Sequence, residues 1–280
     1  METVEKESLI GREIKCLDKG FVRLVDYMGS DAAIVQAARV SYGAGTKTVN
    51  EDRGLIRYLL RHAHTSPVEM VEFKFHIKVP IFIARQWIRH RTASVNEYSG
   101  RYSEMRDEFY IPDLEQIRPQ STMNKQGRSE ESLPTEKAQE IAENLETSQR
   151  ELYEEYRGML DQDVARELAR INLPLSMYTE WYWKIDLHNL FHFLRLRLDN
   201  HAQYEIRVYG EAIAEIVKEV VPHAWEAFED YILHGQKFSR PELQVLKTLL
   251  KERRPSMEEL AEAGLKTREA REFLAKLESL

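Results

Sequence analysis

With 280 residues, of which 42% are hydrophobic, the chain is long enough to bury a sizeable core as one large domain or two small ones. Lys and Arg number 40 against 47 Asp and Glu, a net charge of -7, so the chain lacks the basic excess of a general nucleic-acid-binding protein and any anion site must be locally basic. The sequence shows no signal-peptide pattern or membrane span, and its single cysteine, Cys16, excludes an intrachain disulfide, so we expect a cytoplasmic protein.

The amino-terminal part of the chain predicts two short helices, a strand and a helix that ends in a cationic run. Apolar residues recur at helical spacing in residues 31–40 and 50–62, where Asp and Asn are available as caps. Residues 71–79 alternate strictly between apolar and polar side chains, which predicts a half-buried strand. Pro80 suits the first position of a helix, and this helix would deliver the run Arg-His-Arg at 89–91 into a loop.

Beyond this loop the pattern changes to longer helices around one further strand. The stretch 115–133 is polar and bounded by prolines, which indicates a mobile excursion, either a disordered insertion or a lid. A long amphipathic helix is expected over residues 135–162, followed by a second one from Val164 to Pro174. Alternating residues at 175–184 then predict another strand.

The last part of the chain is predicted to be helical. Periodic segments at 186–200, 201–221 and 222–233 indicate three helices, and Asp186 can cap the first of them. Residues 240–280 indicate a separate small helical appendage, in which Ser256 and Glu259 have the spacing of a capping box. Strands are therefore few and helices many.

One segment, residues 89–102, differs from ordinary surface or core because it combines three arginines with hydroxyl groups and a glycine. Arginine grips phosphate through two parallel hydrogen bonds, and Ser99 together with the backbone amides near Gly100 can donate further bonds to the same anion. The alternative for such a cluster is a solvated basic turn, which is the commoner use of surface charge.

The spacing of this segment, Arg-His-Arg, seven residues, then Ser-Gly-Arg-Tyr, resembles the signature of the flavin-dependent thymidylate synthases. Further similar segments, in the same order, are AARVSYG at 37–43, HAHTSPVEM at 62–70, PIFIARQW at 80–87 and RLDNHAQYEIR at 197–207. The resemblance covers about residues 13–235. It implies an α/β (α+β) fold, in which a helix-rich subunit contains a small, mainly antiparallel sheet. It also implies a homotetramer whose active sites are shared between chains.

The domain organisation and activity follow from the same resemblance. Residues 1–235 would form the catalytic domain, with 115–133 as a polar insertion and 240–280 as a small helical C-terminal extension. The implied reaction is the reductive methylation of dUMP to dTMP, with methylenetetrahydrofolate as the carbon donor and NADPH as the hydride source through FAD. No nucleic acid or membrane partner is implied.

The resemblance also implies a set of site residues. Arg197 is the expected catalytic residue, because a fixed guanidinium can stabilise negative charge that develops on the uracil ring. The residues implied for FAD are His64, Ser66, Arg89, His90, Arg91, Glu97, Asp186, His188 and His192. The residues implied for dUMP are Gln86, Arg89, Glu97, Ser99, Gly100, Arg101, Arg170 and Arg197. Ser41, at the end of its predicted helix, is expected near the flavin or another subunit, with helix capping as its alternative role.

The sequence departs from the family pattern at one of these positions. Asp186 stands where an asparagine is expected, so its carboxylate puts that flavin contact in doubt and leaves helix capping as its other role.

Two other classes of function remain open from the residues alone. His188 and His192 lie one helical turn apart, with His201 beyond, and such a pair can bind zinc in a metal-dependent hydrolase. The leucines around them favour a core helix with ordinary histidines, so we expect no metal. A nucleic-acid-binding protein would use the Arg-His-Arg loop on backbone phosphate, which the acidic balance of the chain disfavours.

The single cysteine bears on the mechanism. Thymidylate synthesis without flavin activates the uracil ring with a positioned, ionisable thiolate. Cys16 lies in a segment that predicts a short strand, so we expect it to be structural and expect the flavin to carry the difficult step.

Overall fold

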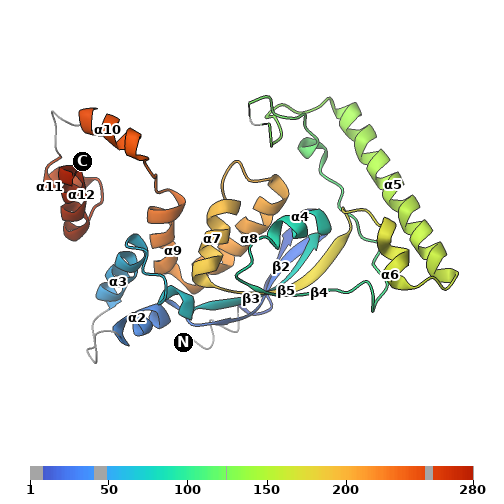
Figure 1. Ribbon diagram of the computed structural model, residues 1–280, viewed down its shortest axis with the longest axis horizontal. Coiled ribbons are helices and arrows are strands. Elements are labelled where there is room, and N and C mark those ends of the chain that lie inside the picture. Colours follow the sequence, from blue (N-terminus) through green and yellow to red (C-terminus); the bar gives the residue numbers. More distant parts are fainter. Residues whose placement is uncertain (1–8, 41–48, 124, 250–254, 280) are drawn as a thin grey trace. The chain divides into compact units, whose positions relative to one another are not determined.

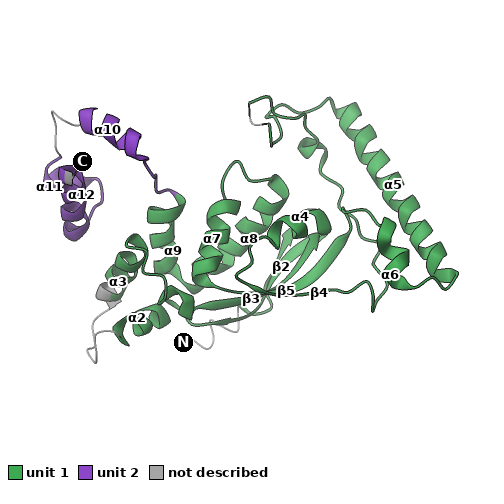
Figure 2. Cartoon of the chain, in the orientation of Figure 1, with its two compact units in different colours: residues 1–233 green, residues 234–280 purple. Residues whose placement is uncertain are grey.

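The computed structural model describes residues 9–40, 49–123, 125–249 and 255–279. Internal contacts divide the chain into two compact units, Met1–Leu233 and His234–Leu280 (Figure 2).

The larger unit is built on a five-stranded sheet in which every neighbouring pair of strands is antiparallel. In the order in which they lie side by side, the strands are β1 (Glu13–Cys16), β2 (Gly20–Met28), β3 (Glu72–Pro80), β5 (Tyr178–Asp186) and β4 (Ser94–Glu97). The predicted strands at 71–79 and 175–184 correspond to β3 and β5, and the strand expected around Cys16 is β1. β4 was not predicted: part of the segment expected to be a loop is paired with β5 instead.

Alternation along β3 decides which face of the sheet is buried. Phe73, Phe75 and Ile77 are fully buried, whereas the polar residues between them lie on the other face. Helices α4 (Ile81–Trp87), α7 (Leu187–Arg197) and α8 (Tyr204–Val220) cover the apolar face (Figure 1). Each fully buried Phe contributes roughly 1.5–3 kcal/mol relative to an exposed one, so this layer holds the unit together.

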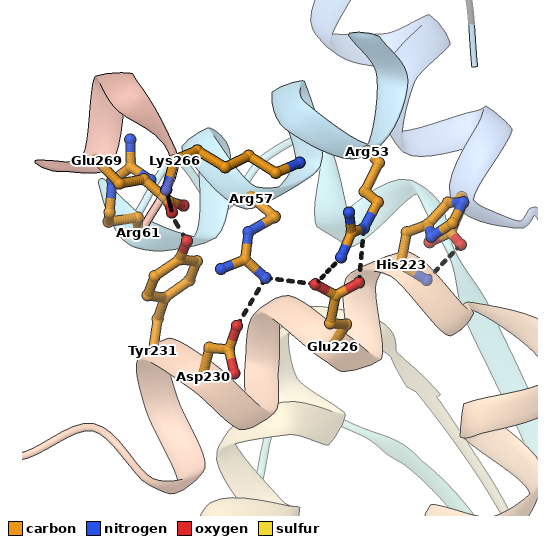
Figure 3. A network of polar contacts seen from close by, with 10 residues as sticks. Arg53, Arg57, Arg61, His223, Glu226, Asp230, Tyr231, Lys266 and Glu269 are labelled. Carbon is orange, nitrogen blue, oxygen red and sulfur yellow. Dashed lines mark hydrogen bonds and ion pairs between the residues drawn. The ribbon is translucent and has the colours of Figure 1, made fainter. Parts of the chain in front are cut away.

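A second group of helices packs beside the sheet: α2 (Asp31–Val40), α3 (Val49–Arg61), the short η1 (Val68–Met70), α9 (Pro222–Phe228) and the π-helical turn η4 (Glu229–Leu233). Charged residues join α3 to α9 and η4 (Figure 3). Glu226 accepts hydrogen bonds from Arg53 and Arg57, and Arg57 also donates to Asp230 at 2.6 Å. The Arg57 side chain is only 11% exposed, so the two carboxylates compensate a largely desolvated charge.

The segment between β4 and β5 forms its own smaller apolar cluster. It contains η2 (Leu114–Gln116), the long α5 (Thr135–Asp161), the short α6 (Arg166–Ala169) and the 3-10 turn η3 (Arg170–Asn172). The helix expected up to Pro174 is therefore broken into two short pieces. The buried side chains of the cluster are Met105, Phe109, Tyr156, Ala169 and Met177.

The polar stretch 115–133 is tied back to the sheet-covering helices. Gln120 and Arg128 form an isolated β-bridge, and the Arg128 guanidinium pairs with the buried carboxylate of Glu205 at the start of α8. Tyr110 also donates to Glu205, at 3.1 Å. The stretch 115–133 thus contains a β-bridge and is held to α8 by the ion pair of Arg128 with Glu205.

The smaller unit consists of α10 (Arg240–Leu249), α11 (Met257–Glu262) and α12 (Thr267–Ser279). The predicted capping box is confirmed, because Ser256 and Glu259 each accept a hydrogen bond from the backbone amide of the other. Gly264 ends α11 with a φ of 90°, a conformation that favours glycine.

Candidate active site

The candidate site begins where α4 leaves the core. Trp87, the last residue of α4, is fully buried, and its ring contacts those of Trp183 and Phe193 with centroids 5.2 and 4.8 Å away. This anchor brings the chain to the surface immediately before the cationic run. Arg89 and Arg91 are exposed, whereas the half-buried His90 packs edge-on against Phe193, its ring centroid 4.9 Å away.

His90 meets Arg197, a residue from the end of α7 that is 107 positions away in the sequence. Nε and Nη2 of the Arg197 guanidinium lie 3.2 and 2.9 Å from His90 Nε2. Because a guanidinium only donates hydrogen bonds, Nε2 must be the acceptor and the ring proton must be on Nδ1. The pair therefore fixes both the tautomer of the imidazole and the direction of the guanidinium.

The surroundings keep the imidazole neutral. Burial, followed by the charge of Arg197 and then that of His192, lowers the pKa of His90 from 6.5 to about 4. Burial also lowers the pKa of His192, and of Arg197 from its high ordinary value. At neutral pH the pair therefore carries the positive charge of the arginine alone, beside the two exposed arginines, which suits an anionic ligand.

The loop after β4 brings the predicted phosphate-binding residues together with Arg170. A Cβ added to Gly100 would lie 2.7 Å from Met105 Sδ and 3.1 Å from Arg170 Cδ, so this position is closely packed. Ser99 Oγ accepts a hydrogen bond from the Arg101 amide at 3.3 Å. The Arg101 guanidinium pairs with Glu167 at 3.0 Å, and both side chains are more than half exposed.

Two further predicted residues flank these groups. Gln86 Oε1 is buried, and within the described residues it has no hydrogen-bond partner, an arrangement that costs free energy unless a ligand or water donates to it. Glu97, at the end of β4, accepts a hydrogen bond from Thr179 Oγ1 at 2.8 Å. Sequence analysis did not single out Thr179, because only the pairing of β4 with β5 shows that it faces Glu97.

His64 and Ser66 form a separate group. Both are exposed and follow α3, where Ala63 has a left-handed φ of 54°. The ring of His64 lies 5.7 Å from that of Tyr58, between centroids, and not beside His90. Within the described residues, no hydrogen bond or ring contact joins His64 or Ser66 to the His90–Arg197 pair.

The start of α7 carries the remaining predicted residues. Asp186 caps this helix: its two oxygens accept hydrogen bonds from the backbone and side-chain nitrogens of Asn189, at 3.0 and 2.7 Å. The capping role that sequence analysis kept open for Asp186 is therefore present. His188 is half-buried, and the exposed His192 lies near His90, with ring centroids 5.9 Å apart. Ser41 lies outside the described residues.

Comparison with known proteins identifies the family. The family model described as "Thymidylate synthase complementing protein" matches residues 23–223. A flavin-dependent thymidylate synthase of Treponema denticola is 57% identical over 268 residues, which span 96% of this chain and 98% of that protein. The chain belongs to the flavin-dependent thymidylate synthase family.

Other members and a solved structure agree with this assignment. A flavin-dependent thymidylate synthase of Rickettsia bellii is 57% identical over 256 residues, 87% of each chain. The solved structure of the UMP/dUMP methylase PolB from Streptomyces cacaoi, bound with 5-Br dUMP, is 33% identical with a TM-score of 0.72. That alignment covers 80% of this chain and all of PolB, so the helix-rich α+β fold is the fold of that methylase.

The described residues contain no group of three or more His, Cys, Asp or Glu side chains arranged to hold a metal ion. None of the helices formed by these residues is long and apolar enough to cross a membrane.

Proposed function

We propose that this member of the family makes dTMP by reductive methylation of dUMP, with FAD as the flavin, NADPH as its reductant and methylenetetrahydrofolate as the carbon donor. The observation that carries the proposal is the His90–Arg197 pair, in which the Arg-His-Arg run at 89–91 fixes the guanidinium of an arginine from the end of α7. The dUMP analogue bound to PolB supports dUMP as the nucleotide. The names of the close relatives support a flavin.

The residues around the pair fit a flavin dinucleotide. Such a cofactor has an anionic pyrophosphate and a flat ring system with polar edges. Arg89 and Arg91 offer exposed guanidiniums for the anion, while His90 and His192 offer imidazole rings beside them. We assign these four residues to FAD, together with Glu97, Asp186 and His188.

The nucleotide would be held at two ends. Ser99, Gly100, Arg101 and Arg170 would bind its phosphate through guanidinium and backbone donors. Gln86 and Glu97 would contact the remainder, since the Gln86 oxygen is buried and free to accept a hydrogen bond from a ligand. The closeness of Gly100 to Arg170 supports a common role for the two residues.

Arg197 would act on the uracil ring. Its guanidinium, oriented by His90, would stabilise negative charge on the ring carbonyls as the base is activated. A bound flavin would supply hydride, which no protein side chain provides. Since reduced flavin can deliver hydride to the ring, no protein nucleophile is required.

The environment of Cys16 supports a reaction without a protein nucleophile. The thiol is 1% exposed, and burial raises its pKa to about 12. A thiolate at this position is therefore strongly disfavoured at neutral pH, which argues against thiolate attack on the uracil ring.

The proposed assembly is a homotetramer with shared active sites in the cytoplasm. The separation of His64 and Ser66 from the His90–Arg197 pair within one chain supports the idea that a neighbouring subunit contributes them. We further propose that residues 1–235, which contain the whole stretch matched by the family model, form the catalytic domain. Residues 240–280 would be an extension, shared in large part with the Treponema denticola relative, whose alignment spans 96% of the chain.

The test is a combined cofactor and turnover measurement. The purified protein should be yellow, release FAD on denaturation, and form dTMP from dUMP only with NADPH and methylenetetrahydrofolate. His90→Ala and Arg91→Ala should remain folded but purify with less FAD, because each removes polar contacts and little buried apolar surface. Full FAD occupancy in both variants would refute the flavin assignment, and bound zinc without flavin would favour a hydrolase.

A further inference from the structure

The proposed phosphate loop is supported from behind by a residue outside the family signature. Met105 is 8% exposed, and its Sδ lies 2.7 Å from the position that a Cβ on Gly100 would occupy. The backbone of Gly100 therefore packs directly against this thioether. The position of Met105 consequently limits how the Ser99–Arg101 turn can sit.

Two tyrosines of α5 hold the backbone of Met105 at both of its polar groups. The hydroxyl of Tyr156 accepts a hydrogen bond from the Met105 amide at 2.9 Å. The hydroxyl of Tyr153 donates to the Met105 carbonyl at 3.0 Å. Next to them Arg157 pairs with Glu104 at 2.9 Å, so three residues of one helix face fix this point of the loop.

The same apolar cluster also sets the position of Arg170. Met105, Tyr156 and Ala169 are buried together in it, and Arg170 directly follows Ala169. The Arg170 side chain reaches Gly100, since its Cδ lies 3.1 Å from the position that a Cβ on that glycine would occupy. One buried cluster thus lies behind both halves of the proposed phosphate site.

We propose that Tyr156 and Tyr153 are positioning residues for the nucleotide phosphate: through Met105 they set the spacing between the Ser99–Arg101 turn and Arg170. This inference rests on the proposed function, because it takes dUMP as the ligand of that loop. Neither tyrosine touches the nucleotide in this scheme. Their effect should therefore fall on recognition of the phosphate and not on the chemistry at the ring.

The decisive variant is Tyr156→Phe, which keeps the buried ring and removes the acceptor for the Met105 amide. We expect dUMP to bind about five- to tenfold more weakly, since a buried N–H is left unpaired behind the loop. The rate at saturating dUMP, the FAD content and nucleotide-free flavin reduction by NADPH should stay within about twofold of the parent, because the ring-activating pair is untouched. Deoxyuridine, which lacks the phosphate, should compete equally well in parent and variant.

Tyr209→Phe is the matched control. Tyr209 is fully buried and its hydroxyl donates to the Lys78 carbonyl at 2.7 Å, so this variant loses a similar buried hydrogen bond between α8 and β3, outside the apolar cluster that supports the phosphate loop. It should retain parental dUMP affinity. If Tyr156→Phe does not fold, the half-buried Tyr153→Phe carries the same test with a smaller expected loss of about two- to fivefold.

The possible results distinguish a failure of the positioning role from a failure of the proposed function. Parental dUMP affinity in the folded variant, or an equal loss for dUMP and deoxyuridine, would overturn the positioning role. An equal weakening in Tyr209→Phe would also overturn it, since any buried hydroxyl would then have the same effect. Failure of the parent protein itself to bind dUMP or make dTMP would instead refute the proposed function.

Discussion

Replacement of Arg197 by lysine tests the proposed catalytic role most directly. The guanidinium places two N–H groups, on Nε and Nη2, at 3.2 and 2.9 Å from His90 Nε2, and its remaining N–H groups are directed by that pairing. Lysine keeps the positive charge but ends in a single ammonium, so it cannot reproduce this planar two-point contact. The substitution therefore changes geometry while leaving charge in place.

The size of the effect follows from the hydrogen bond that is lost. A hydrogen bond to a charged group contributes about 1.5–3 kcal/mol, which corresponds to a factor of roughly ten to a hundred in rate if it acts in the transition state. We therefore expect Arg197→Lys to form dTMP about ten- to a hundredfold more slowly at saturating dUMP. Reduction of the flavin by NADPH should change by less than about twofold, because it does not require charge on the uracil ring.

The assay needs both rates from the same preparation, with Arg101→Lys as the control. Because the Arg101 side chain is 58% exposed, its contact with the phosphate would be screened by solvent, so its replacement by lysine should weaken dUMP affinity by only about 0.2–1 kcal/mol. Parental dTMP formation by Arg197→Lys once dUMP is saturating would refute the reasoning. Arg197 would then be a binding residue only.

Four further outcomes are expected. Cys16→Ala should retain dTMP synthesis with a stability cost of about 1 kcal/mol, since the thiol is buried and un-ionised; loss of turnover in a folded variant would restore the thiolate mechanism. Glu167→Gln should bind dUMP about two- to fivefold more tightly at low salt, because Arg101 loses its competing carboxylate; unchanged affinity across a salt titration would argue against Arg101 as a phosphate ligand. The pKa of His90 is lower in the folded chain than its ordinary value of 6.5, so the unfolded state takes up the proton first and the free energy of unfolding should fall as pH drops from about 6.5 towards 4. Thermal melts of His90→Gln should lose this part of the pH dependence. An identical dependence of melting temperature on pH in parent and variant would contradict the low pKa of His90. Gly100→Ala should weaken dUMP binding about tenfold because its methyl group would lie 2.7 Å from Met105 Sδ, and adding Met105→Ala should recover part of the loss; no recovery would mean that the thioether is not the obstacle.

Local patterns in the sequence determined much of the scaffold. The strict alternation of residues 71–79 predicted β3, since a strand with one buried face needs apolar side chains at every second position. Hydrogen bonds between neighbouring residues were equally predictable, as in the capping box of Ser256 and Glu259. The spacing of the Arg-His-Arg segment was enough to indicate the family, which the comparisons confirm.

Tertiary structure decided the relations between residues that are distant in the chain. The pairing of His90 with Arg197 joins positions 107 residues apart, and neither residue's local pattern reveals its partner. β4 was missed because its four residues are all exposed, so the sequence shows no alternation of apolar and polar side chains there. The pairing of β4 with β5, and the contact of Glu97 with Thr179, therefore could not be predicted.

The phosphate loop also combines a part that the sequence predicted with contacts that depend on tertiary structure. The sequence alone indicated Ser99–Arg101 as an anion site, because hydroxyl, glycine and guanidinium groups stand next to one another there. That Arg170 lies against Gly100, and that Met105 and two tyrosines of α5 support the turn, depended on how the apolar cluster between β4 and β5 packs. Sequence fixes which groups are available, whereas close packing of side chains from separate elements decides which of them meet.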